Sequence, residues 1–214
     1  MKRALITGGS GAIGAALVRE FASDYEVIFT YLNNAENAAN LEKETGACAV
    51  KCDVCDREGI FKLINEYPHF DLLINNAGIS QIKLFTDTTP RDWEEMLAVN
   101  LTGAFNFAQA VLPAMLRRKS GVIINVSSVW GETGASCEVA YSAAKAGLIG
   151  FSKALAKEVE PSGVFVGYIA PGAVESPMNA GFSEAELIEA TGELLKPEDV
   201  AKNIKNLITN RCYK

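Results

Sequence analysis

Two residues four positions apart could together carry out proton transfer. Tyr141 and Lys145 lie in a stretch, residues 139–146, whose composition favours a helix, so their side chains would share one face a turn apart. A phenol has a pKa of about 10 by itself, and a nearby ammonium group stabilises the phenolate, so we expect the pKa of Tyr141 to be lowered toward neutrality. Such a tyrosine could give a proton to a carbonyl oxygen, or remove one in the reverse direction.

A Tyr-x-x-x-Lys pattern also arises by chance, and it is then a solvated pair on a helix surface. The polar residues elsewhere in the chain therefore decide the matter. Ser128 ends the apolar run at residues 122–128, and its hydroxyl could hold a substrate oxygen beside the phenol, with Ser127 as the rival. Asn100 lies inside a helical pattern, where the ordinary alternative is an exposed polar residue.

A glycine-rich segment near the amino end could bind a phosphate group. Residues 7–14 read Thr-Gly-Gly-Ser-Gly-Ala-Ile-Gly and lie between a strand signal and a helix pattern. A phosphate must come close to the backbone N–H groups at a helix N-terminus, and a Cβ atom would stand in the way. The spacing of Gly9, Gly11 and Gly14 therefore predicts a dinucleotide loop. The alternative is a tight strand-to-helix turn without a ligand.

The elements that must position these residues alternate along the chain. Short apolar runs predict strands near residues 4–6, 27–29, 48–50, 72–74, 122–124 and 164–166, and helical patterns fill the gaps between them. This order predicts a doubly wound parallel sheet, the Rossmann fold, with three layers. Residues 1–214 are too few for two comfortable domains, so we expect a single domain.

Composition excludes several classes of function. Lys and Arg number 20 against 26 for Asp and Glu, which gives a net charge of −6 and argues against binding nucleic acid or an anionic membrane. No apolar run has the length of a membrane span, and the first residues lead directly into a strand signal, so we expect a cytoplasmic protein. Cys52 and Cys55 form a C-x-x-C pair, but with His69 as the only histidine we expect no metal site; redox work is the minor alternative.

Taken together, the motifs resemble the compact members of the short-chain dehydrogenase/reductase family. After the glycine loop come Asn75-Asn76-Ala77-Gly78, then Asn100, then Ser128, which lies thirteen residues before Tyr141, and then Lys145. One residue departs from the family pattern T-G-x-x-x-G-x-G, because Ala12 replaces its middle glycine and Gly11 supplies a glycine one position earlier. The resemblance implies an oxidoreductase that acts on CH–OH or C=O groups with a nicotinamide cofactor.

The resemblance also implies a role for each matching residue. The catalytic set would be Asn100, Ser128, Tyr141 and Lys145, with Asn100 supporting a water-linked proton path to Lys145. Cofactor contacts would come from the glycine loop, from the segments after three other strands, and from the catalytic helix: Thr7, Gly8, Gly9, Ser10, Gly11, Ile13, Gly14, Asn33, Asp53, Val54, Asn76, Ala77, Gly78, Tyr141, Lys145, Pro171, Gly172, Val174 and Ser176. Asp53 would receive the adenine amino group; the alternative is a loop or cap carboxylate.

The second predicted strand indicates which cofactor is used. An acidic residue at its end would accept hydrogen bonds from the ribose hydroxyls of NAD and would repel a 2′-phosphate. Residues 30–34 read Thr-Tyr-Leu-Asn-Asn and contain no Asp or Glu. We therefore expect NADP (NADPH), with NAD the less favoured choice.

The resemblance is greatest to the β-ketoacyl-acyl-carrier-protein reductases, which implies NADPH-dependent reduction of a small-molecule or carrier-bound carbonyl substrate. Residues 130–138 also resemble reductases that act on a ketone-bearing modified lysine of elongation factor P. A non-catalytic NADP-sensing or interaction protein is the alternative from another class.

The family resemblance also bears on assembly. Helices containing residues 93–115 and 141–159 pair with their symmetry mates in the family, and here they carry apolar residues such as Phe105 and Phe151. After the last helical pattern only residues 209–214 remain, without the final edge strand and glycine pair of relatives. We therefore expect a homodimer in which the last edge strand is missing.

Overall fold

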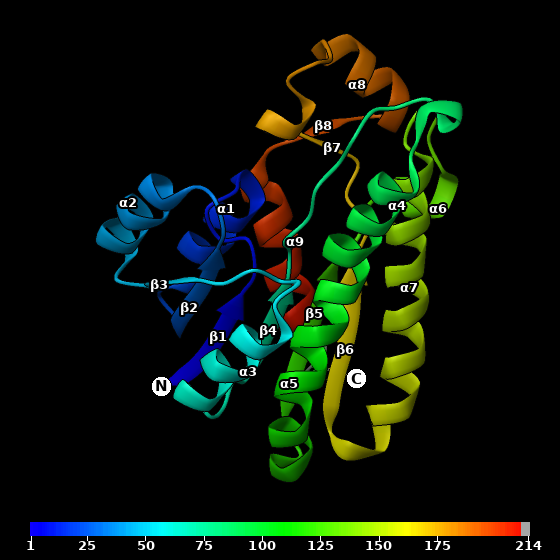
Figure 1. Ribbon diagram of the computed structural model, residues 1–214. Coiled ribbons are helices and arrows are strands. Elements are labelled where there is room, and N and C mark those ends of the chain that lie inside the picture. The colour runs from blue at the N-terminus through cyan, green and yellow to red at the C-terminus, as the bar shows by residue number, and fades with distance from the viewer. Residues whose placement is uncertain (211–214) are drawn as a thin grey trace.

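A six-stranded parallel sheet forms the centre of the protein. The structure is a computed structural model in which residues 1–210 are described. The strand order is β3-β2-β1-β4-β5-β6, and each strand covers one of the six predicted strand signals (Figure 1). The strands are β1 (Lys2–Ile6), β2 (Tyr25–Tyr31), β3 (Cys48–Lys51), β4 (Leu72–Asn75), β5 (Gly121–Val126) and β6 (Val164–Ile169). The order reverses between β1 and β4, where doubly wound sheets bind ligands.

Both faces of the sheet are covered by helices, as continuous apolar strands require. One apolar core lies between the sheet and α1 (Ala12–Phe21), α2 (Ala35–Thr45) and α9 (Pro197–Asn210). A second core lies between the opposite face and α3 (Arg57–Glu66), α5 (Gly103–Arg118) and α7 (Val139–Val159). The doubly wound fold with three layers is therefore confirmed.

Side-chain caps explain where several helices begin. Asn34 caps α2 by accepting a hydrogen bond from the amide of Asn37, and Asp56 caps α3 in the same way. Thr89 and Asp92 form a reciprocal capping box at the start of α4 (Pro90–Leu97), which has proline at its first position. Thr89 and Pro90 thus have the capping roles that their residue types indicate.

A widened helical turn joins α4 to α5. The π-helix η2 (Ala98–Thr102) continues α4 without a break and leads into α5 at Gly103. A π turn inserts one extra residue, and such turns occur often at functional sites. Here the inserted turn carries Asn100, which is 1% exposed.

The remaining elements lie above the carboxyl end of the sheet (Figure 1). They are η1 (Phe85–Asp87), α6 (Trp130–Thr133), η4 (Pro177–Asn179), α8 (Glu184–Thr191) and a two-stranded parallel sheet of β7 (Ala173–Val174) and β8 (Leu194–Leu195). A further turn, η3 (Glu160–Ser162), connects α7 to β6 at the opposite end. Short strands such as β7 and β8 have no detectable periodicity, and sequence patterns did not predict them.

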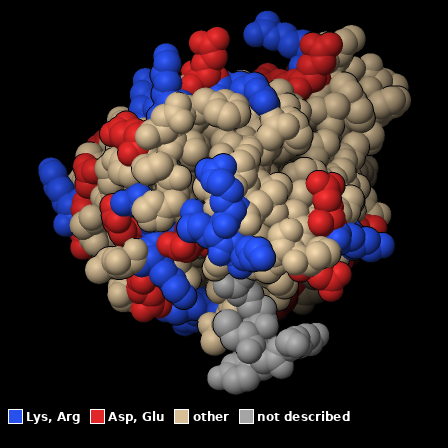
Figure 2. All heavy atoms as spheres, turned by 90° about the horizontal axis from the view of Figure 1, so that it is seen from below, with Lys and Arg blue, Asp and Glu red and all other residues tan. Residues whose placement is uncertain are grey.

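Within residues 1–210, β6 forms one edge of the main sheet, and no later described strand pairs with it. Cys212 and the rest of residues 211–214, part of the segment on which the missing-strand prediction rests, lie outside the described residues. On the face seen in Figure 2, basic and acidic side chains both occur and neither sign covers the whole surface. No helix among the described residues is both long and apolar enough to cross a bilayer.

Candidate active site

Tyr141 and Ser128 meet at the carboxyl end of β5. Ser128 comes two residues after the end of this strand, and Tyr141 lies in the first turn of α7. A side-chain hydrogen bond joins the two residues, and both line one large cavity. The structure thus brings together the phenol and the hydroxyl that sequence reasoning paired.

Lys145 lies one turn after Tyr141 and is 4% exposed. Its Nζ atom is 5.5 Å from the centre of the Tyr141 ring and donates a hydrogen bond of 3.0 Å to the carbonyl oxygen of Val126. Burial lowers the pKa of Lys145 to about 8, because a charged ammonium is poorly solvated there. The group is therefore charged at neutral pH and titrates just above it.

The expected lowering of the Tyr141 pKa is wrong for this structure. Burial of the phenol raises its pKa to about 12, and the hydrogen bond from Ser128 offsets only part of that effect. The negative charge of Glu138 raises the pKa further. Lys145 does not reverse the shift, since its ammonium is hydrogen-bonded to Val126 and lies beside the ring.

Ser127 has a separate task. Its hydroxyl donates a hydrogen bond of 2.9 Å to the backbone carbonyl of Lys145, and the residue is buried. This bond attaches α7 to the end of β5 at the position of Lys145. Of the two neighbouring serines, only Ser128 has its hydroxyl beside the Tyr141 phenol.

A buried polar chain holds α7 against the sheet farther down. Asn75 donates from Nδ2 to Oδ1 of Asn125 at 2.8 Å, and Asn125 donates from Nδ2 to Oγ of Ser152 at 2.8 Å. Ser152 in turn donates to the carbonyl of Leu148. Buried hydrogen bonds of this kind fix relative positions, so the helix that carries Tyr141 has a defined placement relative to β4 and β5.

Asn100 is held by the backbone around it. Its Nδ2 donates to the carbonyl oxygens of Ile79 at 2.9 Å and of Met96 at 3.1 Å, and its Oδ1 accepts from the amide of Ile79 at 3.2 Å. A Cβ atom on Gly78 would lie 2.7 Å from Oδ1 of Asn100 and 3.5 Å from Nζ of Lys145. Asn100 is therefore a neighbour of Lys145 across Gly78, and it is buried.

The glycines of the loop are required mainly by the protein's own packing. A Cβ atom on Gly9 would lie 2.4 Å from the Phe29 ring, and one on Gly14 would lie 2.0 Å from the carbonyl oxygen of Gly8. Gly8 has φ of +68°, a conformation that favours glycine. At Gly11 the nearest such contact is 3.4 Å, so this position alone has ordinary room. Packing within the protein thus accounts for Gly8, Gly9 and Gly14, and the approach of a phosphate to this loop stays a prediction.

The loop is joined to the segment after β4. The Thr7 hydroxyl accepts hydrogen bonds from the amides of Asn76 and Ala77, both at 3.0 Å. Asn76 donates from Nδ2 to the carbonyls of Thr7 and Gly8. The predicted cofactor residues of β1 and β4 therefore form one hydrogen-bonded unit.

The amino end of α1 fits the pyrophosphate of a dinucleotide. The first amides of a helix have no partner inside the helix and favour an anion. Gly11 precedes α1 without a side-chain cap, and the first turn, which contains Ile13 and Gly14, holds no acidic residue. Ser10 is the neighbouring loop residue with a polar side chain.

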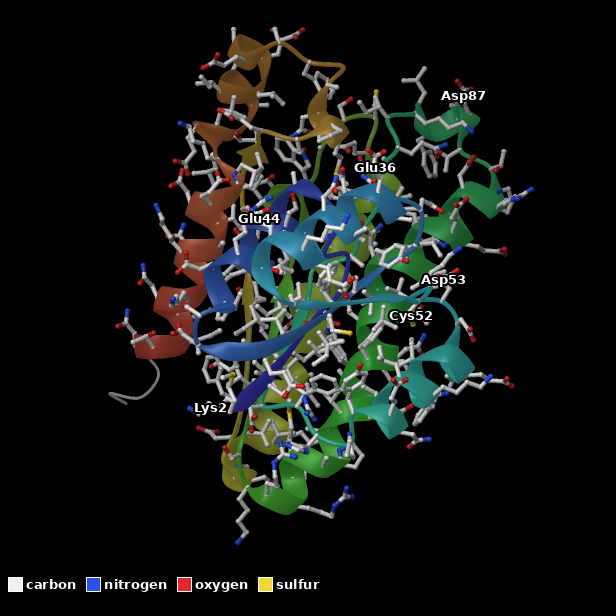
Figure 3. The ribbon with its side chains drawn as sticks, turned by 90° about the vertical axis from the view of Figure 1, so that its left-hand side faces the viewer. Lys2, Glu36, Glu44, Cys52, Asp53 and Asp87 are labelled. Atoms are coloured by element: carbon white, nitrogen blue, oxygen red, sulfur yellow. The ribbon has the colours of Figure 1, made fainter. Side chains whose placement is uncertain are left out.

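The predicted contacts to the ribose and to the adenine of the cofactor lie after β2 and β3. Asn33 is exposed, and the first acidic residue after it is Glu36 in the first turn of α2 (Figure 3). Asp53 accepts a hydrogen bond of 2.8 Å from the amide of Cys55, so its carboxylate acts as a loop cap, as the alternative interpretation held. Val54 packs against Gly103 of α5.

The cavity beside Tyr141 has a volume of about 670 Å³. Ile13, Pro171, Gly172, Val174 and Ser176 line it, so the glycine loop and the segment after β6 reach the same space. Trp130 and Glu138 also line it, and they belong to residues 130–138, the segment on which the second substrate resemblance rests. Its walls further include residues that sequence reasoning did not predict, from the loop after β4, from η4 and from α8: Ser80, Ile82, Met178, Asn179, Phe182 and Glu189. Long-range packing places these residues, and no local motif marks them.

Cys52 and Cys55 show no sign of redox chemistry. Burial raises the pKa of the Cys52 thiol to about 11, and burial followed by the charge of Asp53 raises that of Cys55. High pKa values leave thiols unreactive. Across residues 1–210 no group of three potential metal ligands comes together.

Known proteins show similarity over nearly the whole chain. The family model described as short chain dehydrogenase matches residues 2–187. The 3-oxoacyl-[acyl-carrier-protein] reductase of Aquifex aeolicus is 40% identical over 193 residues, which cover 86% of this chain and 78% of that protein. The acetoacetyl-CoA reductase of Rhizobium meliloti is 39% identical over 210 residues, with coverage of 93% and 87%.

An uncharacterized oxidoreductase of Bacillus subtilis is 36% identical over an alignment of 224 positions, which covers 99% of this chain and 93% of that protein. The crystal structure of a 3-oxoacyl-[acyl-carrier protein] reductase from Brucella melitensis superposes with a TM-score of 0.88 at 33% identity, covering 96% of this chain and 84% of that one. Together with the fold and the Ser128–Tyr141–Lys145 arrangement, these similarities show that the chain belongs to the short-chain dehydrogenase family and is an oxidoreductase acting on CH–OH or C=O groups.

Proposed function

We propose that the protein is an NADPH-dependent carbonyl reductase in which Tyr141 is the proton donor. The observation that carries this proposal is the meeting of the Tyr141 phenol and the Ser128 hydroxyl in the wall of one cavity, with Lys145 a turn away. When bound, the nicotinamide would supply the hydride, and the protein's own groups would handle the substrate oxygen and the proton.

Ser128 and Tyr141 would both donate hydrogen bonds to the substrate carbonyl oxygen. As negative charge develops on that oxygen, Tyr141 would transfer its proton, because an alkoxide is a stronger base than a phenolate. With a pKa of about 12, the phenol keeps its proton throughout the neutral range. Lys145, charged below pH 8, would stabilise the phenolate that remains.

The cofactor would be held largely by backbone groups. The uncapped first turn of α1 would bind the pyrophosphate, and Lys145 would bind the nicotinamide ribose. Asp53, which lies after β3 and accepts a hydrogen bond from the amide of Cys55, would receive the adenine amino group. Asn33, in the acid-free segment after β2, supports the preference for NADPH.

The first substrate candidate is a 3-oxoacyl thioester, bound to a carrier or free. Two of the relatives above are named for reductions of this class, and they cover 86% and 93% of the chain. The cavity volume of about 670 Å³ lies within the usual range for small-ligand sites.

The second candidate is a ketone-bearing modified lysine on elongation factor P. The segment that carries this resemblance, residues 130–138, supplies Trp130, Ser136 and Glu138 to the cavity wall. The segment that carries this resemblance thus forms part of the wall beside the reacting groups.

We also propose a homodimer formed through α4, α5 and α7. Trp93 and Phe105 are 38% and 40% exposed, and Phe105 meets Phe151 of α7 edge to face at 6.5 Å. Exposed aromatic residues on adjoining helices are typical of an isologous contact. Light scattering after size exclusion should give a mass of two chains; a mass of one chain at micromolar concentration would contradict the proposal.

The test of the catalytic proposal is the Tyr141→Phe variant. Removing one oxygen should lower kcat for NADPH-dependent ketone reduction by roughly 100-fold or more, while NADPH binding is retained. Tyr168→Phe is a matched control, because Lys153 lies over the Tyr168 ring at 5.6 Å but Tyr168 does not line the cavity. Near-normal turnover by Tyr141→Phe would refute the assignment.

A further inference from the structure

Glu138 is a half-buried carboxylate in the wall of the cavity that holds Tyr141. It immediately precedes α7 and lies three residues before the phenol. The Ser80 hydroxyl donates a hydrogen bond to its Oε1 atom. Backbone pairing between Lys83 and Cys137, at 2.8 Å, holds the two loops together. Glu138 is therefore a positioned group on a fixed wall.

This carboxylate has no cation beside it in the described part of the chain. None of the ion pairs among residues 1–210 involves Glu138, and Ser80 is its sole side-chain hydrogen-bond partner. Lys83 of the adjoining loop is bound to Asp92 at 2.6 Å, and Lys145 donates to a backbone carbonyl. A partly buried charge without a counter-charge is unfavourable, and burial accordingly raises the pKa of Glu138.

The rest of the cavity wall has the same sign of charge. Among residues 1–210, its other charged lining residues are Glu186 and Glu189, and neither Lys nor Arg lines it. A thioester carried on phosphopantetheine or coenzyme A brings no cation to this wall. A cationic substrate would instead supply the counter-charge that the protein lacks.

The position of Glu138 also affects the reaction itself. Its negative charge raises the pKa of Tyr141 and so makes the phenol a weaker proton donor. A cation bound by Glu138 would cancel this effect at the moment when the substrate is in place. The unpaired negative charge of Glu138 would therefore favour cationic substrates over neutral ones.

We propose that this cavity takes a ketone that carries an ammonium group, and that Glu138, held by Ser80, is the residue that binds the cation. The inference rests on the proposed carbonyl reductase function and narrows its substrate class. It assigns Glu138 to specificity and leaves proton transfer to Tyr141.

The test compares two isosteric ketones that differ only in charge. One is a methyl ketone with a trimethylammonium end group, and the other has a tert-butyl group in its place. Binding to the NADPH complex by calorimetry and turnover are measured for both ketones, with the wild type, Glu138→Gln and Glu132→Gln. Glu132 is a matched control, because it is an exposed residue of α6 outside the cavity wall.

The wild type should prefer the cationic ketone by roughly 10-fold or more in binding and in kcat/KM, as the loss of one charge-assisted contact implies. Glu138→Gln should remove this preference, so that the binding constants and the kcat/KM values of the two ketones differ by no more than about 2-fold. Ser80→Ala should weaken the preference by roughly 3-fold, and Glu132→Gln should retain it.

The two proposals fail in different ways. If the wild type binds both ketones equally, binds neither, or prefers the neutral one, the inference about Glu138 is overturned even when turnover is normal. If Glu138→Gln weakens both ketones equally, the residue is structural and the inference also fails. Charge-selective binding without any turnover would overturn the carbonyl reductase proposal and leave the cation site standing.

Discussion

The glycine loop at residues 7–14 and the cavity wall at residues 128–141 both follow a central strand, yet different atoms shape them. In the loop, backbone meets backbone: Gly8, Gly14 and Ala77 approach each other so closely that an added Cβ atom has no room. In the wall, side chains such as Ser128 and Glu138 project into open space. The first region should therefore be sensitive to volume, and the second to charge and hydrogen-bonding groups.

The largest effect should come from adding one carbon to the loop. Gly14→Ala would place a Cβ atom 2.0 Å from the carbonyl oxygen of Gly8. Because the contacted atom belongs to the backbone, relieving this clash would require the loop itself to shift. We expect a loss of about 3 kcal/mol in the free energy of unfolding, or a drop of roughly 6–12 °C in melting temperature, and at least ~10-fold weaker NADPH binding.

Gly11→Ala is the matched control, since its Cβ atom would meet its nearest neighbour at 3.4 Å. It should stay within about 1 kcal/mol of the wild type. Equal damage by both substitutions, measured by thermal melting, would mean that the loop is sensitive at every glycine and not only at the crowded ones.

The next effect is a dependence of kcat on pH, which we expect from Lys145 in the catalytic region and not from the glycine loop. Burial lowers the pKa of Lys145 to about 8, so its ammonium is present below that pH and is lost above it. The kcat for reduction should be level below about pH 7 and should fall about tenfold per unit above pH 8, while Tyr141, with a pKa of about 12, stays protonated. A rate that rises with pH in this window would contradict the role of Lys145.

Unfolding should not cause that fall in rate. Between pH 8 and the pKa of an unfolded lysine, about 10.4, the unfolded chain binds more protons at this position than the folded one. The contribution of Lys145 to stability therefore rises with pH in that window. Melting temperatures recorded over the same window provide the check, together with NADPH binding, which backbone donors should keep within about 3-fold.

Asn33→Asp should change the choice of cofactor without harming the fold. A carboxylate at this exposed position after β2 would repel a 2′-phosphate and accept hydrogen bonds from ribose hydroxyls. We expect NADPH affinity to fall roughly 10-fold and NADH affinity to hold or improve, measured by fluorescence titration. An unchanged ratio would show that another segment selects the cofactor.

The smallest effect should come from Ser127→Ala in the catalytic region. It removes the hydrogen bond of 2.9 Å to the Lys145 carbonyl and should cost about 1 kcal/mol of stability, seen by urea unfolding. Ser128→Ala should also cost about 1 kcal/mol, because its Oγ accepts a hydrogen bond of 3.2 Å from the Trp130 amide, but it should in addition lower kcat by at least ~10-fold, since its hydroxyl lies beside the phenol. A large loss of kcat in Ser127→Ala with normal turnover in Ser128→Ala would mean that Ser127, and not Ser128, acts on the substrate.

Sequence patterns predicted the sheet, and they predicted which of the polar side chains meet at the end of β5, because strand signals and helix spacing are local. Apolar runs marked the six strands, and the four-residue spacing of Tyr141 and Lys145 gave their shared helix face. The direction of the Tyr141 pKa was wrong, since burial of the phenol outweighs the effect of the neighbouring ammonium. The extent of burial is set by tertiary packing, which no local motif reports.

The substrate side could not be predicted to the same degree. Glu138 and Ser80 lie 58 positions apart in sequence and meet only because the loops after β4 and β5 come together. The strands β7 and β8 are two residues each, too short for any alternating pattern. Asn100 was placed in a helix, but the widened turn that buries it leaves no mark in residue types.

The small sheet of β7 and β8 has a consequence for how this protein can change. Ala173 and Val174 pair with Leu194 and Leu195, and Glu175 donates to the carbonyl of Leu195, so the two ends of the intervening segment are closed together at its base. Residues 176–193 therefore form a loop whose two ends are held together by the β7–β8 pair. Because closing a longer loop costs only slightly more entropy, this loop can be lengthened, shortened or transplanted while the central sheet stays as it is. Because Met178, Phe182 and Glu186 of this segment line the cavity, a change in its sequence would alter the cavity wall and not the central sheet.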